Sequence, residues 1–166
     1  MVQDFSKEVF NSKEKIDVFL DGLATYNLNE DVANALRLLK KIDFKNHSVL
    51  LENLIEEFQV IVVSKSNPDE TITAVFRREG HHKFYISGCK FCSNDFRESN
   101  LLELFEVILK GNYRDKILLK SGEILEKEVS LLNITRRIKT GWFNFFRNPD
   151  KTINKTGMDV LTEEEL

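Results

Sequence analysis

Proline and glycine are scarce in this chain, which has only 2 prolines and 7 glycines among its 166 residues. Flexible linkers are rich in such residues, so their scarcity argues against several domains joined by linkers. A single domain of this length buries about 70% of its unfolded surface, which is enough for a core without disulfides or metals. The hydrophobic fraction of 42% and the charged fraction of 31% are those of a folded, water-soluble protein.

Long apolar runs are also missing. The first residues carry no apolar run of signal-peptide length, and no segment approaches the roughly 20 apolar residues that a membrane-spanning helix needs. In a chain without an export signal, the 2 cysteines are expected to be thiols in a reducing compartment. We therefore expect a cytoplasmic protein without a membrane span.

The motifs of common enzyme classes are absent as well. The chain has no Gly-x-x-x-x-Gly-Lys-Ser/Thr, Gly-x-Gly-x-x-Gly, Gly-x-Ser-x-Gly or His-Glu-x-x-His. It has only 3 histidines, and nothing in the sequence pairs two carboxylates for acid–base chemistry. We predict that the protein is not an enzyme and has no cofactor. Its net charge of −3 also argues against binding of nucleic acid by the whole surface.

What the chain does contain is helical periodicity in residues 1–58. Asn11 and Glu14 have the spacing of a capping box, which predicts a helix start. Apolar residues then recur at helical spacing in three places, and we predict three short helices. The three stripes are Ile16, Phe19, Leu20 and Leu23; Val32, Ala35, Leu36 and Leu39; and Leu51, Leu54, Ile55 and Phe58.

Residues 60–87 change to the patterns of β-strands. The run 60–63 is continuously β-branched, and segments 71–77 and 83–87 alternate apolar and polar residues. Short turns with Pro68 and Gly80 separate them, which predicts an antiparallel meander of three strands. Residues 117–125 could add a hairpin and make five strands, or they could lead into a helix.

Two helices are predicted after the meander. Asn100 and Glu103 form a second capping box, Gly111 follows the last turn, and the apolar stripe between them is helical. In residues 130–147, Leu131, Ile134, Ile138, Trp142 and Phe145 cluster on one helical face. We therefore predict an α+β fold: an N-terminal helical block, the antiparallel meander, the helix near residue 100 and a C-terminal amphipathic helix. Residues 1–147 form one domain, and the polar segment 148–166 is a flexible tail.

The segment 80–92, GHHKFYISGCKFC, holds both cysteines and two of the histidines. Zinc takes four ligands, and Cys89 and Cys92 have the common Cys-x-x-Cys spacing. Either His81 or His82 is a candidate for the third ligand, and His82 is the one we name. A fourth ligand is missing, so the alternative is that the two cysteines are small apolar side chains at the end of the third strand. We favour this structural role over a metal site.

Residues 133–155 form a basic segment in which six cations face a single acid, Asp150. Aromatic side chains lie between the cations, and this combination can bind single-stranded nucleic acid. The residues predicted for such binding are Arg136, Arg137, Lys139, Phe143, Phe146 and Arg147. The alternative is that the aromatic residues form the core face of an ordinary helix.

Acidic residues suggest a different surface. Glu56 and Glu57 end the third predicted helix, and Asp69 and Glu70 lie in the first hairpin turn. Together they could contact a basic partner, if the fold brings them together. The acidic balance and the missing enzyme motifs favour a protein that binds another protein, and among these a neutraliser of a toxic effector, such as an immunity protein. Nucleic-acid binding, with or without a structural zinc, is the alternative.

Overall fold

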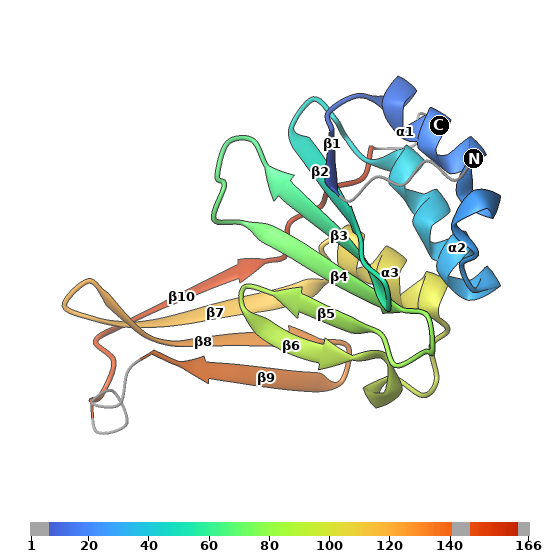
Figure 1. Ribbon diagram of the computed structural model, residues 1–166. Coiled ribbons are helices and arrows are strands. Elements are labelled where there is room, and N and C mark those ends of the chain that lie inside the picture. Colours follow the sequence, from blue (N-terminus) through green and yellow to red (C-terminus); the bar gives the residue numbers. More distant parts are fainter. Residues whose placement is uncertain (1–6, 141–146, 163–166) are drawn as a thin grey trace.

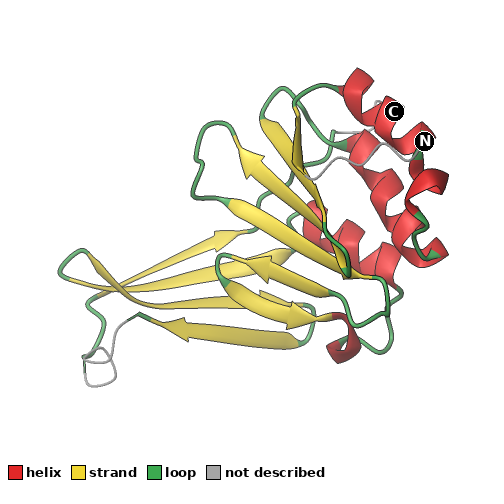
Figure 2. Cartoon of the chain, in the orientation of Figure 1, coloured by secondary structure: helices red, strands yellow, loops and turns green. Residues whose placement is uncertain are grey.

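The computed structural model describes residues 7–140 and 147–162, and it consists mainly of β-strands in two antiparallel sheets (Figures 1 and 2). In the six-stranded sheet the strands follow one another in sequence order. They are β1 (Lys7–Phe10), β2 (His47–Asn53), β3 (Glu57–Ser64), β4 (Thr71–Arg77), β5 (Lys83–Ile86) and β6 (Cys89–Cys92). In the four-stranded sheet the order is β10-β7-β8-β9. These are β7 (Tyr113–Lys120), β8 (Glu123–Leu131), β9 (Ile134–Lys139) and β10 (Lys151–Thr156).

In the described residues, three short helices accompany the sheets: α1 (Lys13–Asp21), α2 (Glu30–Leu36) and α3 (Leu101–Leu109). Each begins at a polar cap whose side chain accepts a hydrogen bond from an amide of the first turn, namely Ser12, Asn29 and Asn100. The same part of the chain also contains three 3-10 segments: η1 (Leu23–Tyr26), η2 (Arg37–Lys41) and η3 (Ser93–Asp95). Within the described ranges, no helix combines the length and the apolar character needed to cross a membrane.

The core lies on one face of the six-stranded sheet, between the sheet and the helices (Figure 1). Along β3, Phe58, Val60 and Val62 are fully buried, whereas the residues between them are partly exposed. Such alternation is expected when only one face of an antiparallel sheet is covered. The helices and the base of the four-stranded sheet contribute to the same core, the latter through Val129 and Leu131 of β8.

The base of the four-stranded sheet packs against the β5–β6 end of the six-stranded sheet. The Ser87 hydroxyl, between β5 and β6, donates a 2.6 Å hydrogen bond to the Asp115 carboxylate of β7. Arg136 of β9 forms a 2.9 Å ion pair with Asp95, which follows β6. The hairpin end of the four-stranded sheet projects away from the body (Figure 1). We call this projecting part the arm.

The predicted fold class is wrong, because the molecule is mostly β and contains two antiparallel sheets rather than a three-stranded meander with helices. The three predicted strands do form as β3, β4 and β5, but within a sheet of six. The helix near residue 100 is confirmed as α3, with the capping box of Asn100 and Glu103 in place. The hairpin at 117–125 also forms, as β7 and β8 around Ser121 and Gly122, both with positive φ.

Two predicted helices are strands instead. Residues 47–53 are β2, and Ile55, counted in the third helical stripe, is 95% exposed in the turn that follows. The predicted C-terminal helix over 130–147 is wrong in its first part, which forms the end of β8 and the whole of β9. The β-branched residues Ile134, Thr135 and Ile138 favour this pairing. Trp142 and Phe145 lie outside the described residues.

The segment expected to be a flexible tail takes part in the fold. Its residues Lys151–Thr156 are β10, which pairs with β7 along six residues. Beyond the strand, Val160 is fully buried and its amide donates to the Leu109 carbonyl at the end of α3. Leu161 pairs with Ile42 in an isolated antiparallel β-bridge. The chain therefore returns from the four-stranded sheet to the helical layer.

Candidate functional site

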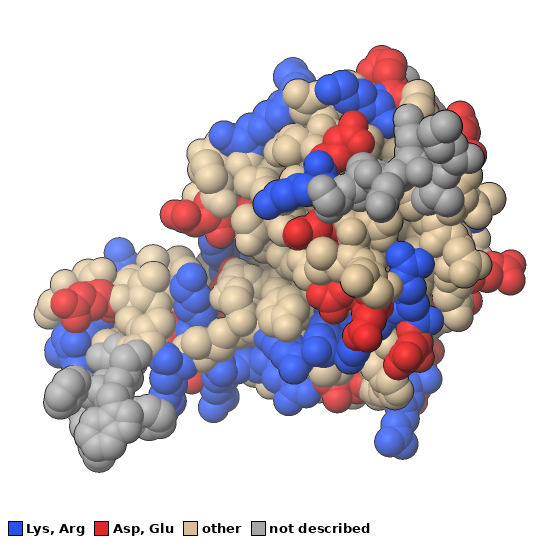
Figure 3. Space-filling view, viewed as in Figure 1, with Lys and Arg blue, Asp and Glu red and all other residues tan. Residues whose placement is uncertain are grey.

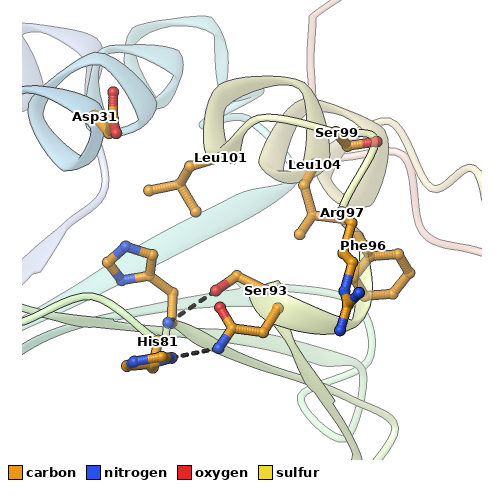
Figure 4. A pocket seen from close by; sticks show the side chains of 10 residues that line it. Asp31, His81, Ser93, Phe96, Arg97, Ser99, Leu101 and Leu104 are labelled. Atoms are coloured by element: carbon orange, nitrogen blue, oxygen red, sulfur yellow. Dashed lines mark hydrogen bonds between the residues drawn. The ribbon is translucent and has the colours of Figure 1, made fainter.

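The two neighbouring histidines line a surface pocket of about 520 Å³. The β4–β5 turn supplies His81 and His82, and the pocket continues over η3 to the start of α3. Figure 4 shows Asp31 of α2 at one end and Phe96 and Arg97 at the other, with Leu101 and Leu104 of α3 along the side between them. The side chains that line it are Asp31, His81, His82, Ser93, Asn94, Phe96, Arg97, Ser99, Leu101 and Leu104.

The backbone holds the half-buried His82 in place. Its amide donates to the Ser93 hydroxyl at 3.0 Å, and its carbonyl accepts from the Ser93 amide at 2.8 Å. Its imidazole Nδ1 accepts from the Arg77 amide at 3.1 Å, so the neutral ring carries its proton on Nε2. Nε2 can only donate a hydrogen bond, and Nδ1 already accepts one from the Arg77 amide. The ring therefore has no free nitrogen to take up a proton from a substrate, which makes it a poor general base.

Burial lowers the pKa of His82, and the nearby His81 lowers it further, while the negative charge of Asp31 acts in the opposite direction. The folded state therefore prefers the neutral ring, and the unfolded chain takes up the proton first as the pH falls. We expect this histidine to contribute stability above about pH 6.5, the ordinary histidine pKa, and to lose it as the pH falls further.

The variant His82→Asn tests this expectation, because an Asn oxygen can still accept from the Arg77 amide. Urea unfolding of the wild type and the variant at several pH values between about 7.5 and 5 measures the difference. As the pH is lowered, the free energy of unfolding should decrease more steeply for the wild type than for His82→Asn. The exposed neighbour provides the control variant His81→Asn. Equal pH dependence of wild type and His82→Asn would contradict the assignment.

A second feature is a row of side chains on the face of the six-stranded sheet opposite the core. Strand pairing places one residue of each strand side by side across the whole sheet. All of them are exposed or partly exposed, and Val9 is 55% exposed. We call this set the open row, and it consists of Val9, Leu50, Ile61, Thr73, Tyr85 and Lys90.

The open row changes character from one edge of the sheet to the other. It is apolar at Val9, Leu50 and Ile61, on strands β1 to β3. It ends at Lys90 on β6, and Lys83 lies on the same face of the neighbouring β5. The row therefore combines an apolar half with a cationic end.

Known proteins offer no guide to the use of these features. The chain gives no significant match to models of protein families, to curated proteins or to solved structures. Evidence about its function therefore comes from its own surfaces and cavities.

The residues proposed as zinc ligands are not brought together. Cys89 and Cys92 lie at the two ends of β6, and residues three apart on a strand point to opposite faces. Cys89 is buried with its sulfur 3.6 Å from the Arg136 carbonyl, and burial raises the pKa of its thiol. His82 is held by the contacts described above. Among the described residues, no three His, Cys, Asp or Glu side chains are grouped as metal ligands.

The four acidic residues proposed for partner binding lie at the two ends of one strand. Glu56 and Glu57 precede or begin β3, whereas Asp69 and Glu70 follow its far end. Glu70 forms a 3.1 Å ion pair with Lys155 of β10. Figure 3 shows acidic side chains scattered among cations on this side of the molecule rather than gathered in one field. The acidic residues therefore do not make a common patch.

The basic residues proposed for nucleic-acid binding lie on and after β9, and the arginines have carboxylate partners. The ion pairs are Arg136 with Asp95 at 2.9 Å, Arg137 with Glu128 at 2.6 Å and Arg147 with Glu123 at 2.8 Å. Lys139 is the exposed last residue of β9. Phe143 and Phe146 lie outside the described residues. These ion pairs lower the positive charge available to phosphates, and nucleic-acid binding by this segment stays a prediction.

Sequence reasoning did not find the open row. Its members are spread from residue 9 to residue 90, and only the register of five strand pairs aligns them. The alternation of residues 71–77 does show which side chains share a face, because successive residues of a strand point to opposite sides. It does not show which residues of the neighbouring strands lie beside them.

Proposed function

We propose that this protein binds another folded protein through the open row of its six-stranded sheet. The observation that supports the proposal is the continuity of the row, which crosses every strand of the sheet and is apolar over its first half. Apolar side chains that lie side by side on an uncovered face are candidates for an interaction site, whereas apolar residues exposed singly are common on folded proteins. A β-sheet also provides a rigid platform for such a site.

The character of the row indicates the chemistry of the partner. Val9, Leu50 and Ile61 favour an apolar patch on the partner, and Lys83 and Lys90 favour carboxylates beside that patch. Four acidic residues were predicted from the sequence to bind a partner. Of these, only Glu57, at the start of β3, lies on the same face of the sheet as the open row. A toxic effector that the protein neutralises, as in an immunity pair, is the narrower form of this proposal.

A pair of matched variants tests the proposal. Ile61→Arg places a charge in the middle of the row, and Val18→Arg makes the same kind of change on α1, where Val18 is 73% exposed. The chain is co-expressed with the products of neighbouring genes, and complexes are isolated by size-exclusion chromatography. Affinity for an isolated partner should fall at least about tenfold in Ile61→Arg and remain unchanged in Val18→Arg.

Binding that is equal in both variants would place the interface elsewhere and contradict the proposal. Circular dichroism of the two variants shows whether each has kept the fold. For the narrower form, wild-type chain should restore growth of cells that produce the partner, and Ile61→Arg should not. If the partner has no effect on growth, the immunity role is contradicted. The proposal that the open row binds a protein is then tested by the affinity measurement alone.

A further inference from the structure

A small cavity of about 130 Å³ lies where the two sheets meet. Its walls come from the start of β4, the β5–β6 turn, the first residues of β7 and the end of β10. The lining is rich in oxygen atoms, with hydroxyl groups from Thr71, Ser87, Tyr113 and Thr156. Glu70, Asp115 and Lys155 add charge, and the remaining lining residues are Gly157 and Met158.

Asp115 is the unusual residue of this cavity. Its side chain is buried, with only 4% of the residue exposed. One carboxylate oxygen, Oδ2, accepts the hydrogen bond from the Ser87 hydroxyl at 2.6 Å. The other, Oδ1, is buried and has no hydrogen-bond partner among the described residues. An unpaired buried carboxylate oxygen is costly, so this atom calls for a hydrogen-bond donor.

The protein's own cation in the cavity is already engaged. Lys155 pairs with Glu70 at 3.1 Å, which balances those two charges. The residues that line the cavity then have a net charge of −1, which comes from the carboxylate of Asp115. Burial raises the pKa of Tyr113 to about 12, and Asp115 and Glu70 contribute to the rise, so this phenol stays neutral. The balance therefore matches one monovalent cation.

The hydrogen-bonding groups indicate what kind of cation fits. The Ser87 hydroxyl uses its hydrogen on Asp115, so its lone pairs remain as acceptors beside Oδ1. Two neighbouring acceptors suit a cation that has several N–H donors. A volume of about 130 Å³ suits a small ion. Lys155 already pairs with Glu70, so a divalent metal beside Asp115 would leave one positive charge without a counter-ion.

We propose that this cavity binds a small primary ammonium ion, of the size of ethylammonium, with Asp115 as its counter-ion and Ser87 as a second acceptor. The ligand would touch strands of both sheets, so its binding also fixes the arm against the body. This site is independent of the open row, which lies on other residues.

Thermal unfolding with different salts tests the proposal. Ethylammonium chloride, tetramethylammonium chloride and sodium chloride are compared at the same concentration of about 100 mM. Tetramethylammonium has the charge but no N–H donor. Ethylammonium should raise the Tm by roughly 3–6 °C if its Kd is near 10 mM, and the other two salts should not.

Two variants locate the effect. Asp115→Asn keeps the shape and removes the charge, so the response to ethylammonium should disappear. Ser87→Ala keeps the charge and removes one acceptor, so the response should be weaker, and this variant provides the test if Asp115→Asn does not fold. An unchanged response in both variants, or an equal response to tetramethylammonium, overturns the proposal. An equal rise with potassium chloride in place of sodium chloride overturns the ammonium chemistry in favour of an alkali ion.

Discussion

Replacement of Gly157 by alanine is expected to lower the free energy of unfolding by about 2–3 kcal/mol, the upper range for forcing extra atoms into a packed site. A Cβ at this position would lie 2.5 Å from ring atoms of Tyr113 and 2.6 Å from the carbonyl oxygen of Gly111. The Tyr113 ring cannot move away freely, because its hydroxyl accepts from the Met158 amide at 3.1 Å. The Gly157 amide also donates to the Tyr113 carbonyl at 2.7 Å.

The structural consequence should be release of the C-terminal segment. Beyond Gly157 the chain is held by the bond from the Val160 amide to Leu109 and by burial of the Val160 side chain. Hydrogen exchange of the amides of β10 and of Val160 should therefore accelerate more in Gly157→Ala than exchange in β2 to β4. The midpoint of thermal unfolding should fall by roughly 5–10 °C.

Gly80→Ala is the matched control for this glycine. Gly80 has a φ of +92°, so alanine is strained there, but a Cβ would meet nothing within 4 Å. The cost should be about 1 kcal/mol, from the backbone alone. If the two variants lose equal stability, with no selective exchange in β10, the close packing at Gly157 does not hold the C-terminal segment.

The parts of the fold that the sequence predicted are those with local signals. For α3, the cap at Asn100, the apolar stripe and Gly111 lie within twelve residues and agree with one another. For residues 117–125 the sequence allows either a hairpin or the start of a helix. The hairpin forms because Ser121-Gly122 suits a two-residue turn with positive φ at both positions. Strands β3 to β5 were found because their alternation is local too.

The errors arise where distant pairing decides the structure. The spacing of Leu51 and Phe58 fits a helix, but both side chains face the core from strands, since β2 pairs with β1 and β3. Likewise Leu131 and Ile134 fit a helical face and are opposite one another in the β8–β9 hairpin. The cavity at Asp115 is formed by segments between residues 70 and 158, so composition and spacing could not reveal it.

Replacement of Phe105 by alanine is expected to be the most damaging of the substitutions considered, with a loss of about 3–5 kcal/mol. Phe105 is fully buried on α3, where its ring centroid lies 5.3 Å from that of Phe76 and 6.1 Å from that of Phe84. These ring contacts join the helix to β4 and β5. Phe105→Ala removes the stabilisation that comes from burying a large ring. It also leaves a cavity between the helix and the sheet, because the surrounding residues relax only in part.

Leu102→Ala on the same helix is the control, since Leu102 is 38% exposed and the two changes have the same effect on helix propensity to within a few tenths of a kcal/mol. Urea unfolding should show a lower midpoint for Phe105→Ala with an unchanged slope, and a small shift for Leu102→Ala. A shift of similar size in both variants would mean that Phe105 is not a centre of the core. That result would contradict the arrangement in layers. In this arrangement α3 and Phe105 cover one face of the six-stranded sheet, and the open row lies on the opposite, uncovered face.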